Sequence, residues 1–180
     1  MMRIMKIENG DLILRNWKDE DAQQLVLIAN NKKIYDNLTD SFPHPYLLND
    51  ASEYITSAQK EDNVSKLFAI EIDGKVMGSI GAFSYKDVYR KNMSIGYYLA
   101  EECWGKGIMS KVIIAFVKYL FNSFDINRVY AEPFARNIGS RKALEKAGFR
   151  LEAELNYNVI KNGVKENSCI YAILKQDFKH

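Results

Sequence analysis

A glycine-rich turn is the segment of the chain with the clearest capacity for chemistry. Residues 101–110 read Glu-Glu-Cys-Trp-Gly-Lys-Gly-Ile-Met-Ser, between an expected strand and an expected helix. Gly105 and Gly107 let a ligand approach the backbone, and the unpaired amides of a first helical turn favour an anion. A diphosphate fits this position, with the Lys106 ammonium at its rim. A tight connection that holds no ligand explains the same pattern equally well.

Three classes of anion site compete for this turn. A Walker loop requires Gly-x-x-x-x-Gly-Lys-Ser/Thr, which the chain lacks. A Rossmann turn requires Gly-x-Gly-x-x-Gly in an early strand–helix–strand unit, but Ser110 replaces the third glycine and hairpin-linked strands precede the turn. A coenzyme A site is the third class, and another nucleotide-binding site that uses this turn is a weaker alternative.

Hydrophobic periodicity and turn signals predict the elements that position this turn. Strands are expected near residues 12–15, 67–72, 75–83, 92–100, 128–132, 149–160 and 165–174. Helices are expected near residues 22–29, from an N-cap at Asn49, and over 107–121 and 140–147. The strand–helix–strand unit over residues 92–132 predicts a parallel strand pair, and the Asp-Gly and Asn-Gly turns predict antiparallel hairpins. The expected fold class is α+β with a mixed sheet.

Composition limits the class of protein. The 180 residues are 47% hydrophobic and 27% charged, which predicts one globular domain over residues 1–180. A net charge of +2 provides no bulk attraction to nucleic acid or to an anionic membrane. Two cysteines and two histidines argue against a disulfide scaffold and against a metal site. Without a secretory signal or a long apolar run, a cytoplasmic location is expected.

Several segments together resemble the GNAT superfamily of N-acetyltransferases, and its RimJ/RimL-type branch in particular. They are Ile95-Gly96-Tyr97-Tyr98-Leu99, Trp104-Gly105-Lys106-Gly107-Ile108-Met109-Ser110, Asn137-x-x-Ser140 with Gly148-Phe149, Leu12-Ile13-Leu14-Arg15 with Asp21-Ala22, and Phe42-Pro43-His44-Pro45-Tyr46. The resemblance implies a mixed, mostly antiparallel sheet with a central splayed parallel strand pair and about four helices.

The resemblance also implies the activity. It implies transfer of an acetyl group from acetyl-CoA, a co-substrate, directly to a primary amine in a ternary complex, without a metal. The acceptor is a protein N-terminus or a small amine, and a non-catalytic acyl-CoA-binding or regulatory module on the same fold is the alternative. No nucleic acid or membrane partner is expected, and both a monomer and a homodimer stay open.

The coenzyme site follows from the same resemblance. The pantetheine arm enters the gap between the splayed strands, and the amides of residues 105–110 hold the diphosphate. Backbone groups of Tyr98 and Leu99 pair with the arm and polarise the thioester carbonyl. The expected coenzyme contacts are Tyr98, Leu99, Trp104, Gly105, Lys106, Gly107, Ile108, Met109, Ser110, Asn137 and Ser140.

The expected proton donor departs from the family pattern. Many members carry Tyr where Leu144 stands, and that Tyr gives a proton to the leaving thiolate. Ser140, on the same helix face, is the expected substitute, and the alternative is a small inward residue bonded to the backbone. Asn137 caps this helix, holds an amide of the arm, or does both.

An amine attacks the thioester only when neutral. An α-amine has a pKa of about 7.7–8.0 and a lysine amine one near 10.4, so an α-amine is the easier acceptor. Glu132, at the end of the second splayed strand, is the expected base and acceptor contact, with plain solvent exposure as the equal alternative. His44 is expected to contact the acceptor, and Cys103 is read as a bystander. Acceptor pockets are expected from residues 39–48 and from the late hairpin near Asn162.

Overall fold

The computed structural model describes residues 4–7, 11–60 and 65–179. Its contacts divide the chain into two compact units, Met1–Ala82 with Gly96–Lys106 and Phe83–Ile95 with Gly107–His180. We call them the first unit and the second unit. Strand β5 (Asn92–Leu99) runs through both, because its first half belongs to the second unit and its second half to the first. The expected single domain stays a prediction.

The first unit carries the N-terminal strands and helices. Its strands are β1 (Ile4–Ile7), β2 (Leu12–Arg15), β3 (Ser65–Ile72) and most of β4 (Lys75–Ser84). Strand β2 pairs antiparallel with both β1 and β3. The turn between β3 and β4 has positive φ at Asp73 and Gly74, as the Asp-Gly signal predicts.

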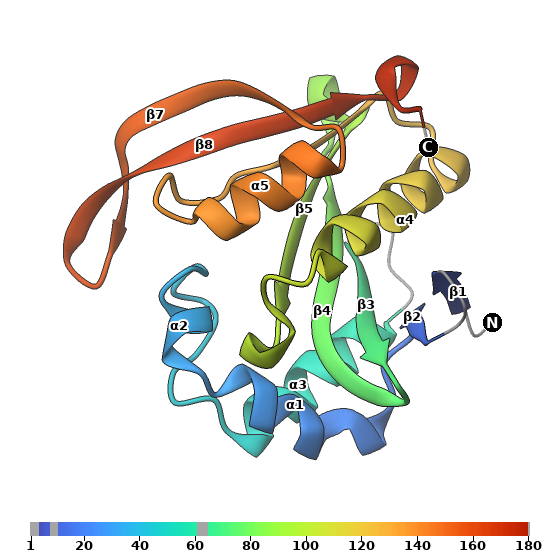
Figure 1. Cartoon of the computed structure of the whole chain (residues 1–180), viewed down its shortest axis with the longest axis vertical. Coiled ribbons are helices and arrows are strands. Elements are labelled where there is room, and N and C mark those ends of the chain that lie inside the picture. Colours follow the sequence, from blue (N-terminus) through green and yellow to red (C-terminus); the bar gives the residue numbers. More distant parts are fainter. Residues whose placement is uncertain (1–3, 8–10, 61–64, 180) are drawn as a thin grey trace. The chain divides into compact units, whose positions relative to one another are not determined.

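Three helices complete the first unit. They are α1 (Ala22–Ala29), α2 (Lys32–Tyr35) and α3 (Leu48–Gln59). Helices α1 and α3 lie side by side (Figure 1), and α3 turns Ala51 and Ile55, one turn apart, into the core. The predicted N-cap at Asn49 is wrong. The helix begins at Leu48 because the Asp50 carboxylate accepts a hydrogen bond from the Leu47 amide at 2.7 Å, which satisfies an otherwise unpaired donor.

The second unit holds the parallel strand pair. Strand β5 pairs in parallel with β6 (Arg128–Ala131) through three residue pairs, from Asn92–Arg128 to Ser94–Tyr130. The ladder stops there, so β6 does not bond along the whole length of β5. Between these strands lies α4 (Ile108–Ser123), the crossover helix. Its buried residues, on which the core of this unit is built, include Val112, Ile113, Phe116, Val117 and Leu120.

The rest of the second unit is a helix and a long hairpin. Helix α5 (Ile138–Lys146) precedes β7 (Arg150–Lys161) and β8 (Val164–Leu174), which pair antiparallel and curve together (Figure 1). Strand β8 also pairs antiparallel with β6. The strand order is β1-β2-β3-β4-β5-β6-β8-β7 in one eight-stranded sheet. The expected fold class is therefore confirmed, an α+β fold with a mixed, mostly antiparallel sheet around the parallel β5–β6 pair.

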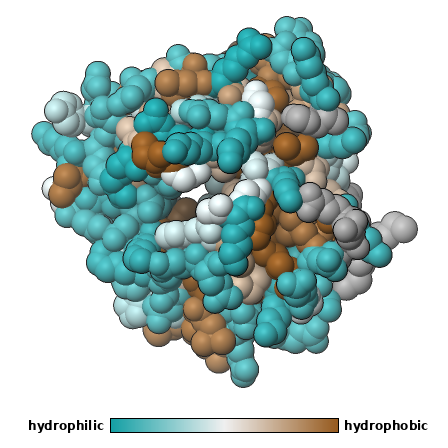
Figure 2. Space-filling view, in the orientation of Figure 1, coloured by the Kyte–Doolittle hydropathy of each residue, from teal (hydrophilic) through white to brown (hydrophobic). Residues whose placement is uncertain are grey.

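The visible surface is mostly hydrophilic (Figure 2), with apolar residues scattered between charged and polar ones. Among the residues that the structure describes, no helix combines the length and the apolar character needed to span a membrane.

Candidate active site

The turn before α4 has the geometry of an anion site. Gly107 is the N-cap of α4 with φ of 72°, and Gly105 has φ of 74°. A β-carbon at either glycine would meet no described atom within 4 Å, so open space lies beside this backbone. Ser110 donates its hydroxyl to the Gly107 carbonyl at 2.8 Å, and the N-cap residue Gly107 has no side chain that could cap the amides of the first turn. These unpaired amides and the helix dipole suit the phosphates of a coenzyme.

The flanking residues of the turn differ in exposure. Trp104 and Lys106 are exposed, whereas Ile108 and Met109 are half-buried and Ser110 is buried. Trp104 donates its indole N–H to the Leu99 carbonyl at 2.7 Å, which ties the turn to the end of β5. The expected coenzyme contacts in residues 104–110 are thus brought together by local chain geometry.

The end of β5 presses closely against β4. A β-carbon at Gly78 would lie 2.4 Å from the Tyr98 carbonyl oxygen, so only glycine permits this approach. The Ala100 amide donates to the Met77 carbonyl at 2.7 Å. Because successive residues of a strand direct their N–H and C=O groups to alternate sides, those of Leu99 point away from β4. The Leu99 N–H is therefore the better placed of the two expected backbone donors.

Aromatic side chains hold the irregular segment of residues 39–47 against β5. The Phe42 ring meets the Tyr98 ring edge-on at 5.4 Å and lies 5.0 Å from the Tyr46 ring. Burial raises the pKa of Tyr98 well above its ordinary value, so this phenol stays protonated at neutral pH. His44 is exposed and stacks on Tyr35 at 5.2 Å, and its contact with the acceptor stays a prediction.

Glu132 is exposed but is held by neutral donors. Its Oε1 accepts hydrogen bonds from the Ser168 hydroxyl at 2.6 Å and from the Asn158 amide at 3.2 Å. Both donors are neutral groups, and they restrict the orientation of the carboxylate. Asn158 and Ser168 were not among the site residues predicted from the sequence. The sequence offered one signal of an irregularity. Asn156 and Asn158 both lie within the expected strand over residues 149–160, and asparagine is uncommon in strands.

The first turn of α5 contains two further expected residues. Asn137 is the N-cap, because its Oδ1 accepts a hydrogen bond from the Ser140 amide at 3.1 Å. The capping interpretation of Asn137 is thereby confirmed, and its contact with the coenzyme stays a prediction. Ser140 is half-buried, and Leu144 one turn later is fully buried. The Glu132 side chain is bonded to Asn158 and Ser168, whereas the Ser140 amide is bonded to Asn137.

Cys103 lies just before the glycine turn and is buried. Burial, with the nearby Glu102 carboxylate, raises the pKa of this thiol. A thiol kept protonated is a poor nucleophile, which agrees with its reading as a bystander. Among the described residues, no group of three or more His, Cys, Asp and Glu side chains could hold a metal ion.

A cluster of hydroxyl groups lies where the parallel ladder ends. Tyr85 and Tyr130 share a hydrogen bond between their hydroxyls, and Tyr85 donates to Ser94 at 3.2 Å. The Arg128 guanidinium lies 4.7 Å from the centre of the Tyr130 ring. Arg128 and Tyr130 alternate along β6 and share one face of the strand, which ends at Ala131, one residue before Glu132. This cluster was not predicted from the sequence, although the alternation of Arg128 and Tyr130 along the expected strand was visible there.

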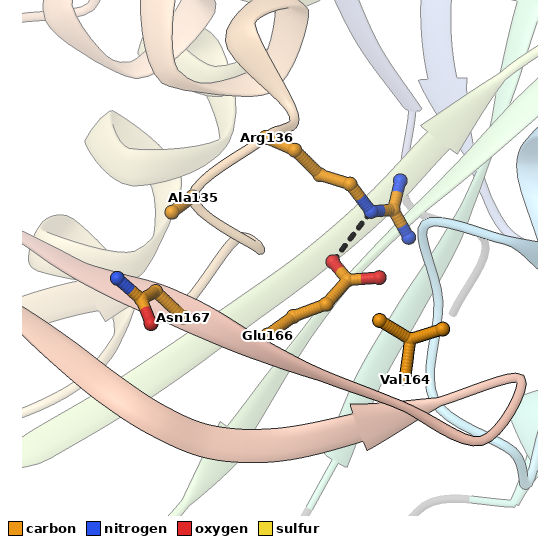
Figure 3. A pocket seen from close by; sticks show the side chains of 5 residues that line it. All are labelled: Ala135, Arg136, Val164, Glu166 and Asn167. Carbon is orange, nitrogen blue, oxygen red and sulfur yellow. Dashed lines mark hydrogen bonds and ion pairs between the residues drawn. The ribbon is translucent and has the colours of Figure 1, made fainter.

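A pocket of about 390 Å³ opens beside the β7–β8 hairpin. Arg136, from the loop before α5, and Glu166, from β8, form an ion pair across it (Figure 3). Ala135, Val164 and Asn167 complete its wall. The pocket is shallow and open to solvent, and its wall offers both charges beside apolar groups. The late hairpin thus borders this pocket, and binding of the acceptor there stays a prediction.

Comparison with known proteins identifies the family. Residues 11–150 match the acetyltransferase (GNAT) domain. A curated relative, the probable N-acetyltransferase YjcK of Bacillus subtilis (strain 168), is 32% identical over 126 residues, which are 70% of each protein. The resemblance read from the sequence motifs is confirmed.

Solved structures share the fold. The RimL ribosomal L7/L12 α-N-protein acetyltransferase in complex with coenzyme A superposes with a TM-score of 0.84, 21% identity and coverage of 96% of this chain and 98% of RimL. Spermidine N-acetyltransferase from Vibrio cholerae, in complex with CoA and spermine, has a TM-score of 0.79, 22% identity and coverage of 94% and 99%. The chain belongs to the GNAT acetyltransferase family and is an acetyl-CoA-dependent N-acetyltransferase.

Proposed function

We propose that this enzyme transfers the acetyl group directly from acetyl-CoA to a primary amine while both substrates are bound. The observation that carries the proposal is the start of α4, whose first-turn amides lack a side-chain cap and lie beside the open glycines Gly105 and Gly107. This is the environment that a diphosphate requires. The amides of residues 105–110 hold the diphosphate, and Trp104 and Lys106 contact the coenzyme at the rim.

The end of β5 supplies the oxyanion donor in this proposal. The Leu99 N–H points away from β4 and donates to the thioester carbonyl, while the Tyr98 backbone supports the pantetheine arm. A donor of this kind contributes about 2.7–4 kcal/mol to catalysis. Asn137 adds a contact to an amide of the arm, and Ile108 and Met109 contact the coenzyme beside the turn.

Two side chains manage the protons. The amine nitrogen forms a bond to the acetyl carbon as the carbon–sulfur bond breaks, so one proton leaves the amine and one joins the sulfur. Glu132 accepts the first proton, directly or through water, and Ser140 donates the second. The hydrogen bonds from Ser168 and Asn158 support this assignment because they restrict the orientation of the Glu132 carboxylate.

The acceptor is a protein N-terminus or a small amine. The similarity to RimL, named for an α-N-protein acetylation, and to a spermidine N-acetyltransferase supports both classes. About one α-amine in ten is neutral at pH 7, far more than for a lysine-like amine, which favours the α-amine chemically. His44 and Glu132 contact the acceptor, and the pocket beside Arg136 and Glu166 accommodates its side groups.

An acceptor screen tests the function. Release of free thiol from acetyl-CoA is followed with N-terminal peptides, polyamines and single amino acids. Acetylation of at least one primary amine is expected, and isothermal calorimetry should detect binding of acetyl-CoA alone. Binding of the coenzyme without transfer to any amine in the panel would contradict the proposal.

Variants test the two proton-handling residues. Ser140→Ala should lower kcat while leaving the affinity for acetyl-CoA nearly unchanged, and Ser52→Ala on the exposed side of α3 is the matched control. An unchanged kcat for Ser140→Ala would reject its role as the acid. Glu132→Gln should alter the pH dependence of kcat, and an unaltered profile would reject its role as the base.

A further inference from the structure

The β7–β8 ladder contains a bulge opposite Asn167. The paired residues run from Leu155–Ser168 directly to Val159–Glu166, so three residues of β7 face one residue of β8. Tyr157, in the middle of the bulge, has φ of 52°, a left-handed conformation that a bulky residue rarely adopts. Bulges of this kind redirect side chains and are common beside active sites.

Two asparagine side chains take the place of the missing backbone bonds. The Asn158 Oδ1 accepts a hydrogen bond from the Ser168 amide at 3.0 Å, and the Asn167 Oδ1 accepts one from the Tyr157 amide at 2.9 Å. These contacts hold the bulge in one conformation. They also turn the Asn158 amide group toward Ser168 of β8 and toward Glu132, just after β6.

The same Asn158 amide reaches the expected catalytic carboxylate. Its Nδ2 donates to the Ser168 hydroxyl at 2.8 Å and to Glu132 Oε1 at 3.2 Å, while Ser168 donates to that Oε1 at 2.6 Å. Ser168 is fully buried, so its hydroxyl is a fixed point. Within the described part of the chain, no hydrogen bond reaches the second oxygen of Glu132, Oε2. Because Glu132 is exposed, this oxygen can accept a hydrogen bond from another molecule.

The backbone after Glu132 is also fixed to β8. The Cys169 amide donates to the Pro133 carbonyl at 2.9 Å, and the Ala135 amide donates to the Asn167 carbonyl at 2.8 Å. These bonds fix the main chain after Glu132, so the position of the carboxylate depends on the rotamer of the Glu132 side chain. Asn158 and Ser168 restrict that rotamer by binding one oxygen only.

We propose that Asn158 is a positioning residue, placed by the β7 bulge to aim the free oxygen of Glu132 at the acceptor amine. The inference rests on the role proposed for Glu132 in the transfer reaction. A bulge with a purely structural function would need Asn158 only as the acceptor for the Ser168 amide. The additional bond to Glu132 distinguishes the two roles.

Two substitutions separate these roles. Asn158→Asp keeps an oxygen for the Ser168 amide but loses the donor to Glu132, whereas Asn158→Leu loses both. Both should lower kcat about tenfold, because a misdirected catalytic group loses rate steeply, and both should leave the affinity for acetyl-CoA unchanged. The matched control is Asn156→Leu, a bulge asparagine whose side chain bonds Asn167 rather than Glu132, and it should change kcat less than about twofold.

A double-mutant cycle with Glu132→Gln completes the test. If Asn158 acts through Glu132, Asn158→Leu should change kcat less than about twofold in the Glu132→Gln background. An equal loss of kcat in both backgrounds, or a kcat of Asn158→Asp equal to that of wild type, would overturn the inference while leaving the N-acetyltransferase activity intact. A wild-type enzyme inactive toward every amine would overturn the proposed function, and the inference with it.

Discussion

The indole N–H of Trp104 donates a hydrogen bond to the main-chain carbonyl of Leu99 across 2.7 Å. The bond links the end of β5, which carries the proposed oxyanion donor, to the glycine turn, which carries the proposed diphosphate site. A 3₁₀ turn over Glu101–Cys103 separates the two residues in the chain. The Trp104 side chain thereby fixes the position of the proposed oxyanion donor relative to the proposed diphosphate site.

Replacing this indole should weaken coenzyme binding. Trp104→Phe keeps an aromatic ring but removes the donor, a loss of about 0.5–1.5 kcal/mol, so the Kd for acetyl-CoA should rise about three- to tenfold in calorimetry. Trp17→Phe is the control, because the buried Trp17 indole N–H has no hydrogen-bond partner among the described residues. Equal losses of affinity in both variants would contradict the role of the Trp104 bond.

A β-carbon in the glycine turn should affect binding beyond its effect on stability. Gly105→Ala and Gly74→Ala both place alanine at positive φ with open space beside it, and each should lower the free energy of unfolding by about 1–2 kcal/mol. Only Gly105→Ala should also weaken acetyl-CoA binding in calorimetry, because its β-carbon occupies the proposed diphosphate site. A similar Kd for the two variants would remove Gly105 from the site.

A buried ion pair should make the first unit sensitive to acid. Arg15 donates to both oxygens of Asp21 at 2.7 and 2.8 Å and also pairs with Glu71. Burial alone would raise the pKa of Asp21, but the hydrogen bonds from Arg15 and from the Lys18 amide outweigh it and lower this pKa. A lowered folded-state pKa contributes stability above the unfolded value of about 3.9, and this stability is lost as the pH falls through the folded value.

Urea unfolding at different pH values checks this expectation. Asp21→Asn should lower the free energy of unfolding by about 3–5 kcal/mol at pH 7, because Arg15 loses its buried partner, and the difference from wild type should shrink below about pH 4. Glu20→Gln removes an exposed pair with Lys18 and should cost less than about 1 kcal/mol. A difference that does not depend on pH would show that Asp21 stabilises the fold by packing alone.

Restoring the tyrosine common in the family should not restore a proton donor. Leu144 is fully buried, so Leu144→Tyr overpacks the core and should lower the free energy of unfolding by about 1–3 kcal/mol in urea titrations. Leu151→Tyr on the exposed side of β7 is the control and should change it by less than about 0.5 kcal/mol. Recovery of kcat by Leu144→Tyr in a Ser140→Ala background would contradict the expectation that a tyrosine at this position supplies no proton.

Features with local causes were predictable from the sequence. The extent of β2, the hairpin turn at Asp73 and the N-cap at Asn137 depend on alternation and on backbone preferences of a few neighbouring residues. The start of α3 was mispredicted by a small shift. Asn49 and Asp50 are both good helix-start residues, and the competing Asp50 carboxylate captured the Leu47 amide.

The sequence by itself determined the order of the elements, the glycine turn before a helix and the position of Glu132 at the end of a strand, because each follows from residues close together in the chain. Only the tertiary structure decided the partners of Glu132. Asn158 lies 26 residues away and Ser168 lies 36 residues away, and both arrive through the register of the β7–β8 hairpin. That register includes a bulge, in which two extra residues of β7 shift the pairing of every later residue in the strand. Pairing between distant strands is a property of the whole sheet, and no local pattern specifies it.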